Sequence, residues 1–407
     1  MNALALPAGV AARFSPDQIQ ALRRLRRDIH AHPELALHEH ETAERLDRAL
    51  SAIPGVDVRR VAGTGLVARI PGRDRRGPVV AIRGDIDALP IREDTGLPFA
   101  STRDGVMHAC GHDVHATWAV GAALLLAGRP AAGDVLVVLQ PAEEIGRGAL
   151  AVLESGALDG VACIFGGHVD RRFEVGQAVA DEGPLAASAD TFTIELTGQG
   201  AHAARPHESA DPVVGAAALV AALQTIVSRR LNPATPGVVT VASIHAGTAP
   251  NVIPDRAVLG GTVRAVEPRS RELMLGEVRR MAESVAASYG LAARVELDRG
   301  TPPLVNSARG AAWARAAASA VLGETGVVPL GFMNMGGEDF AHYLEHMDGC
   351  FLRIGAREPG GETTAAHSPR FAPAEEAIFC GAAILAECAH QAAQTLIGGA
   401  ERADRVG

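Results

Sequence analysis

Three short apolar runs, each followed by acidic or histidine side chains, constrain the fold of this chain most strongly. The runs and the residues after them are Val79–Ile82 with Asp85 and Asp87, Val135–Leu139 with Glu143 and Glu144, and Val161–Phe165 with His168. Runs of this length and composition predict buried strands of a mainly parallel sheet with helices on both faces. Because sites in such sheets form at the carboxyl ends of strands, we expect these side chains to converge. Any one of the acids could instead simply cap a helix.

The hydrophobic pattern changes near residue 187 and changes back near residue 301. Between them it predicts strand, helix, strand, strand, helix and strand, at Thr191–Thr197, Asp211–Arg230, Val238–Ile244, Val258–Val266, Pro268–Tyr289 and Ala292–Leu297. That order is typical of a ferredoxin-like α+β domain. We therefore predict an α/β catalytic domain made of residues 1–186 and 302–407, interrupted by an inserted domain at 187–301.

The remaining predicted elements belong to the α/β part. They are helices at Pro16–Ile29, Glu41–Leu50, Asp113–Leu126, Ala308–Leu322, Asp339–His346 and Pro373–Leu396, and a strand at Cys350–Ile354. The first fourteen residues are mildly apolar, but they lack a basic start and contain Pro7. We predict a frayed terminus there and not a signal peptide.

Composition excludes several classes of function. The net charge of −9 disfavours nucleic acid and anionic membranes as partners. The chain has no lysine, which excludes Schiff-base chemistry and the lysine of a phosphate-binding P-loop. Its five cysteines are odd in number and unpatterned, so a disulfide framework is not expected. We expect instead a location in the reducing cytoplasm.

The segment Met107–His115 holds three histidines and one cysteine at a turn that opens a helix. Cys110 and His112 bracket a single glycine, so both can face the same side of a tight loop. Thiolate and imidazole suit Zn²⁺, and added carboxylates extend the choice toward Mn²⁺. We expect His108 and His115 to have supporting or structural roles.

Gln140–Glu144 ends in two adjacent carboxylates. After a strand, neighbouring side chains point in different directions, so one can bind a metal while the other acts as general base. A solvated acidic helix start would give the same pattern, and this motif alone leaves both interpretations open. Two turn-rich stretches, Gly200–His207 and Gly247–Pro254, are on their own equally typical of surface loops.

Taken together, these residues resemble the metallo-amidohydrolase family of hippurate hydrolase, auxin-conjugate (indole-acetyl-amino-acid) hydrolases and bacterial N-acyl-amino-acid aminoacylases. The motifs that carry the resemblance run in order along nearly the whole chain. They are Arg27–Glu34, Asp85–Pro90, Met107–His115, Gln140–Glu144, Gly200–His207, Asn251–Pro254, Gly336–Phe340 and His367–Pro369.

The resemblance implies a role for each matching residue. The implied ligands of two divalent metal ions, Zn or Mn with Co or Ni as alternatives, are Cys110, His112, Glu144, His168 and His367. Glu143 would be the general base and then the acid, and Asp87 would orient a group beside the metal. His202 would stabilise the oxyanion, in its own subunit or in a neighbour's. Asn251 and Arg264 would contact the substrate carboxylate, for which an arginine fork is suited.

The implied reaction is hydrolysis of an N-acyl amino acid to a carboxylic acid and an amino acid. The resemblance also implies that the inserted domain acts as a lid and joins subunits in a dimer or tetramer. Close alternatives are a dipeptidase, or a deacetylase of a biosynthetic intermediate such as N-acetyl-diaminopimelate. More distant ones are a binding protein that has lost catalysis, which the intact acidic and histidine set disfavours, and a hydrolase with Cys110 as nucleophile.

Three positions depart from the family pattern. Asp170-Arg171-Arg172 follows His168 where relatives often have apolar residues and a proline. Gly337 stands where many relatives have serine, and Phe371–Ala374 lacks the acidic or amide residues common there. None of these removes an implied metal ligand, so they bear on specificity.

Overall fold

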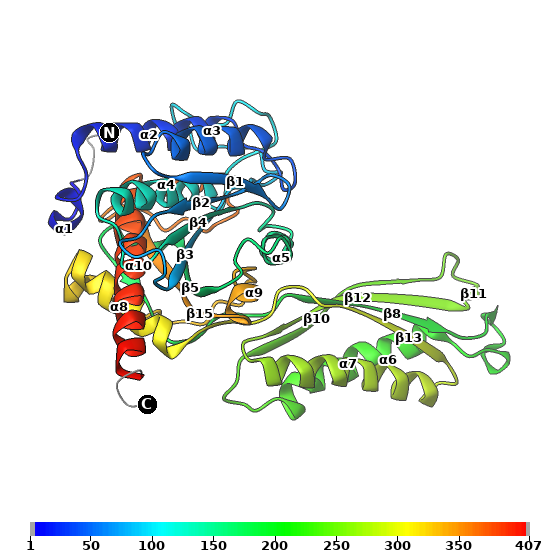
Figure 1. Cartoon of the computed structure of the whole chain (residues 1–407). Coiled ribbons are helices and arrows are strands. Elements are labelled where there is room, and N and C mark those ends of the chain that lie inside the picture. Colours follow the sequence, from blue (N-terminus) through cyan, green and yellow to red (C-terminus); the bar gives the residue numbers. More distant parts are fainter. Residues whose placement is uncertain (1–4, 404–407) are drawn as a thin grey trace. The chain divides into compact units, whose positions relative to one another are not determined.

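The computed structural model describes residues 5–403. The chain forms two compact units (Figure 1). The first unit comprises residues up to 183, 306–331 and those from 342 onward; the second comprises 184–305 and 332–341. The segment 332–341 lies outside the predicted insertion. Two short paired strands, β7 (Gly183–Ala186) and β14 (Leu304–Asn306), contain two of the crossing points.

A seven-stranded sheet forms the centre of the first unit, in the order β1-β2-β4-β3-β5-β15-β6. The strands are β1 (Asp57–Val61), β2 (Gly65–Ile70), β3 (Val79–Asp85), β4 (Val135–Gln140), β5 (Val161–Glu174), β6 (Ala178–Val179) and β15 (Asp348–Arg357). The pairs β4–β3, β3–β5 and β5–β15 are parallel, whereas β1–β2, β2–β4 and β15–β6 are antiparallel. The sheet is therefore mixed, and the prediction of a mainly parallel sheet was wrong in this respect.

The edge strand β1 was missed because its sequence resembles neither a buried run nor a clean alternation. Strand β1 reads Asp-Val-Arg-Arg-Val and is exposed or half-buried along its length. It turns into β2 through Ala62 and Gly63, which both have positive φ. Strand β5 is also much longer than the predicted run, because its charged second half, Asp170–Glu174, continues alongside β15.

Helices α2 (Pro16–Ala31), α3 (His40–Ser51), α4 (His112–Gly128), α5 (Gly148–Glu154), α8 (Ala308–Leu322) and α10 (Glu376–Ala403) complete this unit. Helix α4 is buried for most of its length between the sheet, α2 and α10. The predicted helix Asp339–His346 was wrong: a single turn, α9 (Ala341–Leu344), forms there. The described part of the N-terminal segment does not fray, since α1 (Ala8–Ala11) buries Val10 and Phe14 packs against Phe379.

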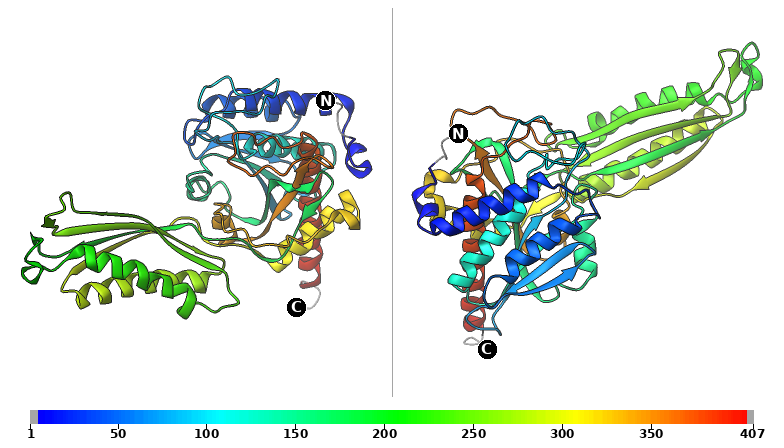
Figure 2. Two further views of the ribbon diagram at one scale, coloured as in Figure 1. Left: turned by 180° about the vertical axis from the view of Figure 1, so that it is seen from behind. Right: turned by 90° about the horizontal axis from the view of Figure 1, so that it is seen from above.

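The second unit has the predicted element order. Its sheet has the order β10-β12-β8-β13, all antiparallel, from β8 (Asp190–Thr197), β10 (Gly237–Ala246), β12 (Arg256–Ala265) and β13 (Ala292–Asp298). Helices α6 (Pro212–Thr225) and α7 (Pro268–Ser288) cover one face of it, as Figure 2 shows. Together the elements form the βαββαβ arrangement of a ferredoxin-like domain. Short pieces are β9 (Ala201–His202), β11 (Val252–Ile253), and the helical turns Pro206–Glu208, Ile226–Arg230 and, in the first unit, Glu324–Gly326.

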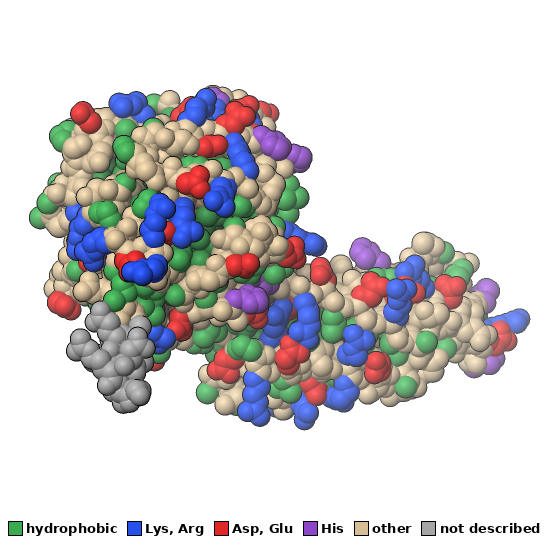
Figure 3. Space-filling view, viewed as in Figure 1, with side chains coloured by type: hydrophobic (Ala, Val, Ile, Leu, Met, Phe, Trp, Pro, Cys, Tyr) green, Lys and Arg blue, Asp and Glu red, His purple; other side chains and the backbone are tan. Residues whose placement is uncertain are grey.

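One helical stretch of the described residues, Pro212–Arg230, is apolar and long enough to cross a membrane by length and composition alone. A third of it is buried inside the structure, where α6 packs against α7 and the sheet of its own unit. Core helices meet the same criterion, so this is weak evidence for a membrane span. In the view of Figure 3, acidic and basic side chains are interspersed over the surface.

Candidate metal centre

A glycine-dependent loop presents the first two candidate ligands. Gly111 has φ +93°, and a Cβ built on it would lie 2.4 Å from Cγ2 of Val169. Only glycine therefore fits this turn without displacing β5. The turn directs Cys110 and His112, the latter being the first residue of α4, toward the same buried region.

Cys110, His112 and His168 form one group of possible metal ligands. Their donor atoms lie within 4.8 Å of one another, and all three residues are buried. The His168 Nδ1–H donates to the Val169 carbonyl at 2.7 Å, which leaves Nε2 as the acceptor. That Nε2 lies 3.1 Å from Cys110 Sγ, so the thiol and the imidazole already face each other.

A second group shares Cys110 with the first and adds Glu144 and His367, again within 4.8 Å. His367 Nε2 lies 3.4 Å from Glu144 Oε2. The backbone of His367 has φ +67°, uncommon for a residue with a side chain, and its N–H donates to the Ala109 carbonyl at 2.8 Å. Strained backbone of this kind clusters at functional sites. Two adjacent groups joined by one thiol form an arrangement suited to a pair of metal ions.

Asp87 holds both groups in place. The His112 Nδ1–H donates to the Asp87 carbonyl at 2.9 Å and lies 3.1 Å from its Oδ1, while Asp87 Oδ2 accepts the Glu144 N–H at 3.0 Å. The free lone pair of His112 is therefore on Nε2. This Nε2 and Glu144 Oε1 are buried and have no hydrogen-bond partner among the residues that the structure describes. Since an unpaired buried polar atom costs about 1–3 kcal/mol, these atoms fit a bound cation.

The protonation preferences of the site fit the same conclusion. Burial raises the pKa of the Cys110 thiol well above its ordinary value, and the Glu144 charge raises it further. Burial also raises the pKa of Glu144 itself. Without a cation these groups favour their neutral forms, whereas a bound divalent ion would reverse that preference.

Glu143 lies beside this cluster, in a group with His112 and Glu144. The turn that displays it depends on Ala142, whose φ is +54°. Glu39, which the sequence analysis missed, fixes this turn: its carboxylate accepts the Ala142 N–H at 2.9 Å and the Thr64 hydroxyl at 2.6 Å. Burial raises the pKa of Glu39. Glu39 lies about a hundred residues from the turn in sequence, and only the fold brings them together.

The other two histidines of the dense segment behave differently from His112. His115 Nδ1 lies 2.6 Å from Asp85 Oδ1, and its Nε2 accepts the Val169 N–H at 2.9 Å, so both ring nitrogens are engaged. His108 is fully buried, and neither of its ring nitrogens has a hydrogen-bond partner. Burial lowers the pKa of His108 to about 4, so the ring is neutral at pH 7.

The remaining candidates lie in the second unit. His202 on β9 pairs with Val252 on β11, directly beside Asn251, and Ala203 N–H donates to the Asn251 carbonyl. His202 Nδ1 accepts the Ala204 N–H at 3.0 Å, so its proton is on Nε2. Arg264 lies at the other end of this unit. It lies eight positions after Arg256 on β12, which corresponds to about 26 Å along the strand. Arg256 pairs with Thr197, which ends β8 just before β9. One subunit therefore does not bring Arg264 and Asn251 together.

Gly337 belongs to the same unit and lies beside Arg264. A Cβ built on Gly337 would lie 2.8 Å from Thr301 Oγ1, 2.9 Å from Ala189 Cβ and 3.8 Å from Arg264 Nη1. A serine there would therefore crowd its neighbours, which explains the departure from the family pattern in this chain.

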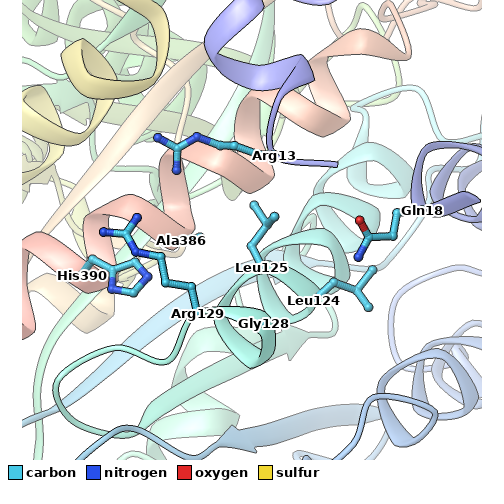
Figure 4. A pocket seen from close by; sticks show the side chains of 8 residues that line it. All are labelled: Arg13, Gln18, Leu124, Leu125, Gly128, Arg129, Ala386 and His390. Atoms are coloured by element: carbon cyan, nitrogen blue, oxygen red, sulfur yellow. The ribbon is translucent and has the colours of Figure 1, made fainter. Parts of the chain in front are cut away.

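A hollow of about 410 Å³ is lined by none of the candidate residues (Figure 4). Its lining is Arg13, Gln18, Leu124, Leu125, Gly128, Arg129, Ala386 and His390. Arg13 and Arg129 both pair with the one carboxylate of Glu387, at 3.2 and 3.3 Å. Nothing in this hollow matches the chemistry of the metal-type cluster.

Comparison with known proteins agrees with the site. Residues 81–391 match the family model described as peptidase family M20/M25/M40. The chain is 42% identical over 377 residues to an N-acetylcysteine deacetylase of Bacillus subtilis, covering 90% of this chain and 96% of that protein. It is 36% identical over 384 residues to the IAA-amino acid hydrolase ILR1-like 2 of Arabidopsis thaliana, covering 93% and 86%. The crystal structure of Bacillus subtilis YXEP, titled a dinuclear metal binding peptidase from the M20 family, is similar with a TM-score of 0.83 and 38% identity, covering 94% of this chain and 100% of that one.

The fold and the cluster define a metal-dependent amidohydrolase. The chain belongs to the M20/M25/M40 peptidase family.

Proposed function

We propose that this enzyme hydrolyses the amide bond of N-acyl amino acids with two divalent metal ions held by Cys110, His112, Glu144, His168 and His367. The observation that carries the proposal is the pair of ligand groups sharing Cys110, together with the orphaned buried atoms of His112 and Glu144. A thiolate with imidazoles favours Zn²⁺, and the carboxylate extends the choice to Mn²⁺, with Co²⁺ or Ni²⁺ as alternatives. When bound, the ions would polarise the scissile carbonyl and acidify water.

The chain's own residues account for the proton transfers. Glu143 accepts a proton from the attacking water and returns it to the leaving amine. Its neighbours Glu144 and His112 are metal ligands in this proposal. Asp87 orients both, since one of its carboxylate oxygens contacts the His112 ring and the other accepts the Glu144 N–H. The separation of roles between Glu143 and Glu144 follows from the left-handed turn at Ala142.

On the substrate side, His202 donates its Nε2–H to the developing oxyanion, and Arg264 and Asn251 bind the substrate carboxylate. Since His202 and Asn251 share one end of the second unit and Arg264 lies at the other, we propose that the first two serve a neighbouring subunit's site. The second unit then acts as both lid and dimerisation domain.

Exposed apolar side chains of the second unit support this dimer. Strand β10 is an edge strand, and α6 packs beside it. Val213 and Val214 on α6 and Val238 and Ile244 on β10 are between 36 and 49% exposed. An open edge next to exposed valines needs a cover, and a second copy can pair with both. Sedimentation of Val214→Glu should give monomers where the wild type gives dimers; a monomeric wild type at high concentration contradicts the proposal.

The substrate class rests on the relatives. Both are named for compounds in which an acyl group is joined to an amino acid, acetyl in one and indole-acetyl in the other. We propose an N-acyl amino acid with a small acyl group, since the N-acetylcysteine deacetylase has the higher identity. A dipeptidase is the second candidate, because the similar crystal structure is titled a peptidase. All five cysteines are free and buried, which supports a cytoplasmic location.

The test is hydrolysis of N-acetyl, N-benzoyl and indole-acetyl amino acids and of dipeptides, with and without chelator and added Mn²⁺ or Zn²⁺. We expect one acyl class to turn over and chelation to abolish turnover. Glu143→Gln should keep its metal and lose about 10²–10⁴ in rate. A fully active Glu143→Gln refutes the general-base role. A metal-loaded enzyme that turns over dipeptides alone refutes the N-acyl assignment.

A further inference from the structure

The stretch Asp170-Arg171-Arg172, which departs from the family pattern, contains a buried arginine with no part in the proposed chemistry. Arg171 is on β5, three residues after His168, and only 8% exposed. Arginine is seldom buried to this degree unless its donors are used. Its contacts therefore indicate what it does.

The Arg171 guanidinium binds the loop between β15 and α10 at both ends. Nη1 donates to the carbonyl of Ala356 at 3.3 Å, to the Glu358 carboxylate at 3.1 Å and to the carbonyl of Ala372. Nη2 donates to the carbonyl of Glu362 at 2.8 Å. One side chain thus binds the segment 356–372 at its beginning, at two residues before His367 and at its end.

This segment carries His367 and has no helix or strand of its own beyond the end of β15. His367 has a left-handed backbone whose N–H donates to the Ala109 carbonyl, but its side chain is 55% exposed, so packing does little to orient the ring. After His367, the chain is fastened by the Pro369 carbonyl, which accepts the Asp94 N–H at 2.8 Å. Between β15 and His367, two side chains donate hydrogen bonds to the backbone of the segment. Arg171 donates to the Glu362 carbonyl, and Arg357 donates to the Gly361 carbonyl.

We propose that Arg171 is a positioning residue that closes the loop 356–372 and thereby presents His367 to one of the two metal ions. The inference rests on the proposed function, since it takes His367 as a ligand. The three backbone carbonyls are bound from two different nitrogens, Nη1 and Nη2, which the planar fork of arginine supplies, whereas the three N–H groups of an ammonium all leave a single nitrogen. The loop closure sets the affinity of the ion bound by Cys110, Glu144 and His367, and leaves the group of Cys110, His112 and His168 intact.

Titration calorimetry of the metal-free enzyme with Mn²⁺ tests this directly. The wild type should bind two ions per chain, and Arg171→Lys should bind one of them about 10–100-fold more weakly, with the other unchanged. His367→Ala identifies the affected ion, and adding Arg171→Lys to it should weaken the remaining ion no further. Glu358→Gln, a milder change at the half-exposed end of the contact, should weaken the same ion by a few-fold in a variant that folds normally.

Arg271→Lys is the matched control. Arg271 is also 8% exposed and also binds a carboxylate and a carbonyl, those of Asp190 and Gly300, but within the second unit. It should lower the unfolding temperature without changing either metal affinity. Wild-type affinities in both Arg171→Lys and Glu358→Gln overturn the inference, as does equal weakening of both ions. A wild type that binds no pair of ions overturns the proposed function, and the inference with it.

Discussion

The candidate residues of the two units are held in opposite ways. In the first unit, the side chains of His112 and His168 are buried, and each has one ring nitrogen fixed by a hydrogen bond to a carbonyl. In the second unit, His202 is exposed on a strand of two residues, and its ring is fixed only by the N–H of Ala204. The first arrangement is preorganised by the fold of one subunit.

This difference separates two tasks. A metal ligand must be in place before the ion arrives, because each misplaced donor lowers the affinity. A group that stabilises an oxyanion must meet the substrate after it binds, so it can come from a surface that is completed later. We therefore expect variants of the metal ligands in the first unit to change metal content, and variants of His202 in the second unit to change rate alone.

The largest effect should come from His112→Ala. The change removes a metal-binding atom from the buried group and leaves Asp87 Oδ1 without its partner. Metal content by atomic emission should fall and activity should drop to background. Full metal content with low activity would instead mean that His112 is not a ligand. Arg271→Lys, whose contacts with Asp190 and Gly300 lie within the second unit, is the control for reduced stability.

His202→Ala should lower kcat by about 10²–10³ with metal content unchanged, because one oxyanion donor is lost. Its exposure predicts no change in the unfolding temperature. The comparison is sharpened by mixing. If His202 serves a neighbour, unfolding and refolding His202→Ala together with Glu143→Gln should restore about a quarter of wild-type activity, since half of the dimers then contain one complete site. Mixtures as inactive as their parents place His202 in its own subunit's site.

Asp87→Asn should have a smaller effect, on the first unit only. The amide keeps the size of the carboxylate but weakens its hold on the His112 Nδ1–H and the Glu144 N–H. We expect metal affinity about 10–100-fold lower, with kcat of the fully loaded enzyme nearly restored at high metal concentration. A loss of kcat that excess metal does not restore would assign Asp87 a direct catalytic role.

The candidate ligands predicted from the sequence lie together in the structure, whereas the predicted sheet lacks several of the strands that the structure contains. Buried parallel strands are encoded as continuous apolar runs, so β3 and β4 were predicted, and the acids after them pointed to the site. The edge strand β1 is encoded by charged residues and a turn at Ala62–Gly63, a pattern that fits a surface loop equally well. The mixed sheet follows from strands of that second kind.

Contacts between distant segments had no sequence signal. Glu39 binds the backbone N–H of Ala142, and Arg171 binds backbone carbonyls of the segment 356–372. Since every residue type has a backbone carbonyl, and nearly every one an N–H, such contacts cannot be predicted from the sequence. Likewise, the separation of Arg264 from Asn251 depends on the length of β12, which a motif does not report. The ring nitrogens of His115 could be assigned a structural role only after Asp85 and Val169 were seen beside them.

The smallest expected effect on activity concerns His108, which belongs to the buried region but to neither ligand group. Its folded pKa of about 4 lies below the ordinary 6.5, because burial excludes the charged ring. Between pH 6.5 and 4 the unfolded chain therefore takes up a proton that the folded chain does not, so this contribution to stability is full above pH 6.5 and is lost as the pH falls to 4. The loss amounts to about 3 kcal/mol at about 1.4 kcal/mol per pKa unit.

Urea unfolding of the metal-free enzyme at pH 7, 6 and 5 measures this contribution, and His108→Gln is the comparison because glutamine does not titrate. Activity of the loaded variant at pH 7 should stay close to that of the wild type. The wild type should lose more stability than the variant as the pH falls. Parallel losses would mean that the His108 ring is solvated or hydrogen-bonded in the folded enzyme. The burial that encloses Cys110 and His112 would then not include this neighbouring histidine.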